Sequence, residues 1–214
     1  KKLGFKKISV IEYGVAEGSG LLSLEKYSSE IGKILDIEID VYGFDTGEGL
    51  PKPIDYRDLQ YHWKEGFFSM NKEELKNKLK KAKLIIGDIE KTSKTFIKEY
   101  NPAPIGAVIH DFDFYSSTKK ALNMMKENDS FFLPRVFSYF DDIIGSEIEL
   151  YNDYTGERLA INEFNLESDS IKISPAYHLI SRPKLSWYDQ IRIIHFFNHK
   201  KYNTFISDET HLPI

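Results

Sequence analysis

The chain has 214 residues, of which 41% are hydrophobic, and its 15 Phe and 13 Tyr supply bulky core material, so a globally disordered chain is excluded. The formal net charge of −4 argues against a general nucleic-acid binder, and the absence of cysteine excludes disulfides, thiolate nucleophiles and Cys-ligated metal sites. Because no apolar run approaches the roughly 20 residues of a membrane span and no signal peptide precedes the first predicted strand, we expect a cytoplasmic protein that binds neither nucleic acid nor membranes.

The first two thirds of the sequence alternates predicted strands and helices. Near-continuous apolar runs predict five strands, over Lys7–Tyr13, Ile37–Phe44, Leu84–Gly87, Ile105–Ile109 and Phe131–Phe140. Apolar residues at helical spacing predict helices over Ser19–Ile34, Asn71–Lys83, Thr92–Tyr100 and Ser116–Lys126, the last with Ser116 or Ser117 as its N-cap. Such an alternation is typical of a parallel sheet with helices on both faces.

The C-terminal third is less regular. Thr155–Asn165 is predicted to be a helix, and Ile171–Ile180 is predicted to be a strand. The apolar segment Ile191–Phe197 fits either a strand or a helix. His195 and His199 are four residues apart, so on a helix the two side chains could bind a metal.

Each of the five predicted strands ends at an acidic residue. These residues are Glu12, Asp45, Asp88, the pair Asp111 and Asp113, and the pair Asp141 and Asp142. The carboxyl ends of the strands in an open parallel sheet share one edge, and ligands bind along that edge. Acids at strand ends also serve as turn formers or helix caps, but five of them in register beside a glycine-rich loop favour a binding site.

The glycine-rich loop Glu12–Gly20 reads EYGVAEGSG and joins the first strand to the first helix. Glycine permits positive φ angles and lets the backbone approach a ligand closely. The glycine spacing differs from the dinucleotide fingerprint, and the Gly-Lys-Ser/Thr ending of a P-loop is absent. The acid before the loop would repel a pyrophosphate but suits a positive centre. S-adenosylmethionine carries an ammonium and a sulfonium and has no phosphate.

Two further acids have expected roles beside this loop. We expect the Asp45 carboxylate to accept hydrogen bonds from ribose hydroxyls. Asp88 fits two roles equally well: it faces the edge of an adenine, or it caps the helix that begins near Thr92.

The segment His110–Thr118 reads HDFDFYSST and follows the fourth strand. In an extended chain Asp111 and Asp113 would point to the same side. The fourth and fifth strands are neighbours in the usual strand order, so Asp141 and Asp142 should lie close to them. Four converging carboxylates would repel one another, and a hard divalent cation such as Mg²⁺ would relieve that repulsion. The alternative is that one of these pairs only caps a helix.

At these residues the sequence resembles the metal-dependent O-methyltransferases typified by macrocin O-methyltransferase, which act on sugars of antibiotics and other glycosides. The likeness covers roughly residues 7–142. It rests on the segments Glu12–Gly20, Gly43–Pro51, Gly87–Asp88 with Lys91–Thr92, Asp111–Thr118 and Asp141–Asp142. The Phe-Asp-Thr-Gly-Glu-Gly-Leu-Pro block and the Asp-x-Asp-x-Tyr-Ser-Ser-Thr block are rarely combined elsewhere, so the resemblance is specific.

The resemblance implies an α/β, Rossmann-like class I methyltransferase fold with a mostly parallel seven-stranded sheet and helices on both faces. It implies a single domain over residues 1–214, with a core over 7–142 and C-terminal strands and helices over 143–214. It also implies S-adenosyl-L-methionine as methyl donor and Mg²⁺ or a similar divalent cation. Asp111 matches the general base, and Asp113, Asp141 and Asp142 match the metal ligands. The expected donor-binding residues are Glu12, Gly14, Gly18, Ser19, Asp45, Thr46, Asp88 and Ile89.

The implied reaction moves a methyl group to a hydroxyl of a sugar or other small hydroxylated metabolite, in natural-product or polysaccharide biosynthesis. A divalent ion would lower the pKa of that hydroxyl, and a carboxylate would take its proton. The expected partner is therefore a small-molecule or glycoside acceptor. Members of the family often associate, so a homo-oligomer stays open.

Three other functions remain as alternatives. Asp111-Phe-Asp113 is also the Asp-x-Asp motif of metal-dependent glycosyltransferases that use nucleotide sugars. A nicotinamide oxidoreductase is opposed by the glycine spacing. A non-catalytic binding protein could keep the same fold. The aromatic segment Tyr61–Phe68 fits either a lid over the substrate or a surface helix packed on the core.

Overall fold

The computed structural model describes residues 1–126, 129–179, 182 and 185–207. Within these residues one seven-stranded sheet has the strand order β3-β2-β1-β4-β5-β7-β6. Its strands are β1 (Lys7–Tyr13), β2 (Glu38–Asp45), β3 (Lys83–Ile86), β4 (Ile105–His110), β5 (Phe132–Phe140), β6 (Ile171–Pro175) and β7 (Ile191–Phe196). The first five strands are parallel, and β7 runs antiparallel to both of its neighbours, β5 and β6. The expected mostly parallel sheet is thus confirmed.

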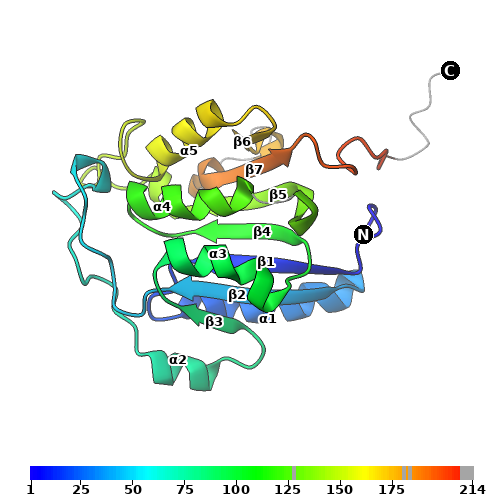
Figure 1. Cartoon of the computed structure of the whole chain (residues 1–214), viewed down its shortest axis with the longest axis horizontal. Helices are drawn as coiled ribbons and strands as arrows, with labels where there is room; N and C mark the ends of the chain where they lie inside the picture. Colours follow the sequence, from blue (N-terminus) through cyan, green and yellow to red (C-terminus); the bar gives the residue numbers. More distant parts are fainter. Residues whose placement is uncertain (127–128, 180–181, 183–184, 208–214) are drawn as a thin grey trace.

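Helices cover both faces of the sheet, with α3 and α4 on one face and α1 on the other (Figure 1). The helices are α1 (Ser19–Leu35), α2 (Lys72–Lys78), α3 (Ile89–Tyr100), α4 (Tyr115–Leu122) and α5 (Gly156–Glu167). Phe96 of α3 packs edge-on against the rings of Tyr42 and Phe44 in β2, at centroid distances of 4.9 and 5.1 Å. On the opposite face, Leu21 of α1 and Leu75 of α2 lie in a second buried cluster. Burial of these apolar side chains holds the layers together.

The helix predicted over Asn71–Lys83 is shorter in the structure and ends at Lys78. The backbone N–H groups that follow it do not continue the helix. Those of Lys80 and Ala82 donate to the Glu25 carboxylate of α1, at 3.0 and 2.7 Å. Because this carboxylate takes the donors that a helix would need, the chain turns directly into β3.

Two helix starts also differ from the prediction. Helix α3 begins at Ile89, three residues before Thr92, because the Asp88 side chain accepts the Glu90 N–H at 2.9 Å and caps it. Helix α4 begins at Tyr115, so the predicted capping by Ser116 or Ser117 is wrong. The Ser116 N–H instead donates to the carboxylate of Asp58, a residue distant in sequence, at 2.9 Å.

The C-terminal third resolves the ambiguity of Ile191–Phe197 in favour of a strand, β7. The idea of a helical metal pair is therefore wrong: His195 lies in the sheet, 3.2 Å from the Ser174 hydroxyl and 2.9 Å from the Tyr202 hydroxyl. The strand predicted over Ile171–Ile180 ends at Pro175, where the chain enters a short 3₁₀ turn, and Ile180 lies outside the described residues.

No helix among the described residues is both long enough and apolar enough to cross a membrane.

Candidate active site

A cavity of about 450 Å³ opens at the carboxyl edge of the sheet. Residues from the ends of the five parallel strands form its floor, and the long segment after β2, which runs past that edge in Figure 1, contributes to its wall. The segment after β5 contributes Ile144, Glu149 and Tyr151 to the opposite wall. The lining includes Gly14, Asp45, Thr46, Asp88, Ile89, Asp111, Asp113, Asp141 and Asp142 among the residues that the sequence pattern predicts. The edge of the sheet at which we expect a ligand therefore holds a cavity.

The glycine-rich loop after β1 lies directly against the turn after β4. Gly14 has φ +78°, and a Cβ added there would stand 1.7 Å from the backbone oxygen of Asp111. The Asp111 N–H donates to the Tyr13 carbonyl at 3.0 Å. Only glycine fits at residue 14, and its smallness allows the two segments to share one wall of the cavity.

Glu12 lies behind this loop and does not line the cavity. Its side chain is 6% exposed, and its Oε2 atom has no hydrogen-bond partner among the described residues. Burial, followed by the charges of Asp111 and Asp45, raises the pKa of Glu12 to about 8. A Cβ on Gly20 would stand 2.0 Å from Glu12 Oε1, so glycine at residue 20 makes room for the carboxylate. The role of Glu12 in donor binding stays a prediction.

The other predicted donor residues have defined contacts. The Asp45 carboxylate accepts the N–H groups of Val15, Ala16 and Gly47 at 2.8, 3.0 and 2.6 Å. These bonds use both oxygens of Asp45, which thereby fixes the glycine-rich loop to the end of β2. The capping role of Asp88 is confirmed, although Asp88 and Ile89 also line the cavity. Gly18 and Ser19 lie at the start of α1, outside the cavity lining.

The carboxylates of Asp111, Asp113 and Asp142 converge, and we name these three residues the acid cluster. One ligand oxygen from each lies within 4.8 Å of the others. Asp113 has φ +59°, so the chain turns after β4 and is not extended as the sequence pattern suggests. The Asp113 N–H donates to Asp142 Oδ2 at 2.8 Å, which ties the ends of β4 and β5 together.

The acid cluster has an unfavourable electrostatic environment. Burial, followed by the neighbouring carboxylates, raises the pKa of Asp111 to about 8 and that of Asp113 to about 9. Burial also raises the pKa of Asp142 to about 6, although hydrogen bonds from Tyr151 and Asp113 oppose the rise. No described residue donates a hydrogen bond to the Asp111 or Asp113 carboxylate. The cluster is thus short of positive partners.

Asp141 lines the same cavity but lies outside the acid cluster. Its Oδ1 atom accepts the Tyr139 hydroxyl at 2.7 Å and the Gln190 amide at 3.2 Å. The four residues predicted as metal ligands or as the base therefore all line the same cavity, and three of them form the acid cluster.

Two polar residues behind the acid cluster are not predicted from the sequence. The Tyr151 hydroxyl donates to Asp142 Oδ1 at 2.7 Å. Glu157, in the first turn of α5, is fully buried and accepts the Asp142 N–H at 3.1 Å. Burial and the charge of Asp142 raise the pKa of Glu157 well above its usual value. The only sequence signal for Glu157 is its position as an acid near the start of a predicted helix. This pattern is common and does not indicate a buried site.

The aromatic segment after β2 forms turns, so the alternative of a surface helix is wrong. Trp63 and Phe68 line the cavity. The Tyr61 hydroxyl donates to the Glu149 carbonyl and thereby joins the two segments that flank the opening. This arrangement gives the cavity a partly apolar wall beside its acidic floor.

The donor atoms present suit a hard divalent cation. Three carboxylates offer oxygen ligands, and two of these carboxylates have no hydrogen bond from a described residue. Burial, followed by the repulsion of the neighbouring carboxylates, raises the pKa values of these two, and a cation would relieve that repulsion. The cavity also has a glycine-rich wall beside the acids, where a ligand with a positive centre would be stabilised. The arrangement can therefore hold a cation and a cationic small molecule side by side.

The structure resembles solved methyltransferases at low sequence identity. It aligns with a crystal structure of the calicheamicin methyltransferase CalS11 with a TM-score of 0.62 and 18% identity, over 88% of this chain and 72% of that chain. The O-methyltransferase NovP gives a TM-score of 0.57 and 14% identity, over 87% of this chain and 71% of that chain. The apo structure of CalS11, described as a TDP-rhamnose 3′-O-methyltransferase, gives a TM-score of 0.53 and 17% identity, over 91% of this chain and 74% of that chain.

Neither models of known protein families nor curated protein sequences match this chain. At the identities above, the structural likeness establishes the fold: a mixed α/β, Rossmann-like methyltransferase fold.

Proposed function

We propose that this protein is an S-adenosylmethionine-dependent O-methyltransferase that acts on a sugar or another small hydroxylated metabolite. One observation carries the proposal: the contact between Gly14 and Asp111 puts the glycine-rich loop and the acid cluster side by side in one cavity. Methyl transfer needs a donor and a hydroxyl held side by side and in line. The methyltransferase fold and the resemblance to macrocin O-methyltransferase support the same function.

The donor fits along the ends of β1, β2 and β3. Its methionine part would lie against the loop around Gly14, where Glu12 lies close behind with a buried, unpartnered oxygen. Its ribose would lie beside Asp45 and Thr46, and its adenine beside Ile89. Asp45 contributes mainly through the loop, because its carboxylate already accepts three backbone N–H groups.

The acceptor hydroxyl would lie at the acid cluster. We assign Asp111 as the base, as the resemblance implies; its carboxylate lines the cavity and accepts no hydrogen bond from a described residue. We assign Asp113, Asp141 and Asp142 as the residues that hold a divalent cation. When bound, that cation would lower the pKa of the hydroxyl and orient it. Asp111 belongs to the acid cluster and Asp141 does not. This difference favours a second arrangement, in which Asp111 replaces Asp141 as the third ligand of the cation.

Calorimetry with S-adenosylmethionine and S-adenosylhomocysteine, with and without Mg²⁺, tests the proposal on the wild type and on Asp113→Asn. We expect micromolar donor binding in both proteins and a loss of Mg²⁺ binding in the variant. Conversion of the donor to S-adenosylhomocysteine in the presence of glycosides would then be measured on both proteins. An absence of donor binding in a well-folded wild type would overturn the proposal.

A further inference from the structure

The walls of the cavity are strongly acidic. Among the described lining residues one cation, Lys120, stands against seven carboxylates. The seven are Asp45, Asp88, Asp111, Asp113, Asp141, Asp142 and Glu149. A divalent cation and a donor with a net charge of +1 would offset only part of this negative charge.

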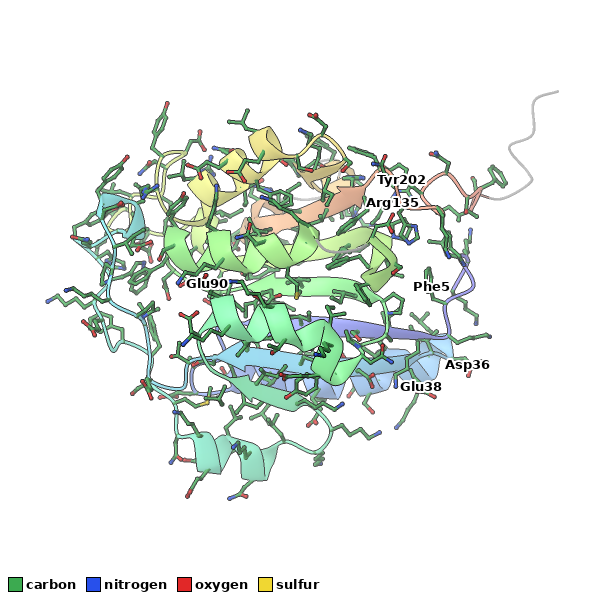
Figure 2. All side chains as sticks on the ribbon, in the orientation of Figure 1. Phe5, Asp36, Glu38, Glu90, Arg135 and Tyr202 are labelled. Carbon is green, nitrogen blue, oxygen red and sulfur yellow. The ribbon has the colours of Figure 1, made fainter. Side chains whose placement is uncertain are left out.

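The cation in the lining is itself flanked by acids. Lys120 Nζ lies 3.7 Å from Asp88 Oδ2 and 3.9 Å from Glu90 Oε2. Glu90 lies at the start of α3, beside the carboxyl edge of the sheet (Figure 2). The positive charge of Lys120 is therefore shared with two carboxylates before any ligand binds.

Three arginines outside the cavity lining are also engaged with other residues. Arg57 pairs with Asp55 at 2.8 Å and lies over the Tyr115 ring. Arg158 pairs with Asp153 through a 2.5 Å contact. Arg135 lies at the opposite end of the molecule, against Tyr202 (Figure 2). None of these guanidinium groups lines the cavity.

The helix starts near the acid cluster do not supply an anion site either. Helix α3 is capped by Asp88, the Ser116 N–H at the start of α4 is taken by Asp58, and the first turn of α5 holds Glu157. Helix N-termini attract phosphate through free N–H groups and the helix dipole. Here carboxylate side chains of the chain itself already lie at these helix starts.

We propose that the acceptor of this enzyme is a polyhydroxylated compound without phosphate. The inference rests on the proposed methyltransferase function and narrows its substrate class. A nucleoside diphosphate would bring two or more negative charges into a cavity whose described residues offer no free cation for them. Trp63 and Phe68 instead present apolar faces on which a sugar ring can stack. The same charges disfavour a glycosyltransferase that uses nucleotide sugars.

The experiment compares matched forms of each sugar with the Mg²⁺- and donor-loaded enzyme. The forms are the methyl glycoside and the thymidine diphosphate sugar. Release of S-adenosylhomocysteine reports turnover, and calorimetry with thymidine diphosphate reports binding of the anion itself. We expect turnover of phosphate-free forms only, and no thymidine diphosphate binding at millimolar concentration.

Binding or turnover of the nucleotide form at least as good as that of the phosphate-free form would overturn the whole inference. Thymidine diphosphate binding decides this point even if no sugar in the set is methylated. Loss of donor binding in the wild type would instead show that the proposed function fails, so the two failures are distinguishable.

Discussion

The backbone oxygen of Asp111 occupies the space that a Cβ on Gly14 would need, with only 1.7 Å between the two positions. The loop that follows β1 and the turn that follows β4 thus touch through their backbones. Because β1 and β4 are neighbours in the sheet, this contact sets the distance between the two halves of the candidate site. A side chain at residue 14 would separate the loop from the acids.

Gly14→Ala should therefore lower the free energy of unfolding by about 2–4 kcal/mol and abolish donor binding, because the new Cβ meets backbone that cannot move aside easily. Chemical denaturation and calorimetry measure the two effects. Gly66→Ala is the matched control: Gly66 also has a positive φ, but nothing lies within 4 Å of the added Cβ. A similar loss in both variants would show that backbone conformation alone is responsible.

Asp111→Asn and Asp141→Asn distinguish the two arrangements of the acids. If Asp111 is the base and Asp141 a ligand, Asp111→Asn keeps Mg²⁺ affinity and loses turnover roughly 100-fold or more, whereas Asp141→Asn weakens Mg²⁺ binding. The reverse pattern of Mg²⁺ affinities would place Asp111 among the ligands, as the acid cluster suggests. Titration calorimetry with Mg²⁺, combined with donor turnover, separates these outcomes.

Tyr151→Phe should weaken Mg²⁺ binding about tenfold, because the Tyr151 hydroxyl orients the Asp142 carboxylate. Donor affinity should not change, since the Tyr151 hydroxyl bonds to Asp142 and Tyr151 is not among the residues proposed to hold the donor. Tyr154→Phe, at an exposed position of the same segment, is the control and should behave as the wild type. Equal Mg²⁺ affinities in all three proteins would exclude a positioning role for Tyr151.

The burial of His110 leads us to expect a specific pH dependence of the free energy of unfolding. Its ring is fully buried, stacks on Phe140 at 4.2 Å, and has no hydrogen-bond partner for either nitrogen among the described residues. Burial lowers the pKa of His110 from 6.5 to about 3. At His110 the unfolded chain therefore binds one more proton than the folded chain between these two values, and the contribution of this residue to the free energy of unfolding falls as the pH drops through that window.

His110→Leu should remove this contribution, which amounts to about 1.4 kcal/mol per pH unit well below pH 6.5. Urea denaturation between pH 7 and pH 4.5 should show that the free energy of unfolding of the variant rises relative to that of the wild type as the pH falls. His62→Gln, at a partly exposed position, serves as the control and should keep the wild-type slope. Parallel stability curves for His110→Leu and the wild type would contradict the prediction.

The sequence by itself determined the layout of the fold and the edge that holds the site. Runs of apolar residues, separated by helical periodicity, specify parallel strands, and the carboxyl ends of parallel strands meet at one edge. The positions of Glu12, Asp45, Asp88, Asp111 and Asp141 at strand ends follow from that rule alone. These are local patterns, so they can be found without knowing which segments touch.

Only the tertiary structure decided which of these residues meet and which are already engaged. Asp45 and Asp88 accept backbone N–H groups of nearby segments, and their carboxylates are thereby largely used. Glu157 enters the site because α5 packs beside the turn after β5, a contact that no local pattern encodes. Segment 191–196 became a strand because it pairs with β5, while its apolar composition suits a helix equally well. Such choices depend on contacts between residues far apart in sequence, and the free energy of those contacts exists only once the chain is folded.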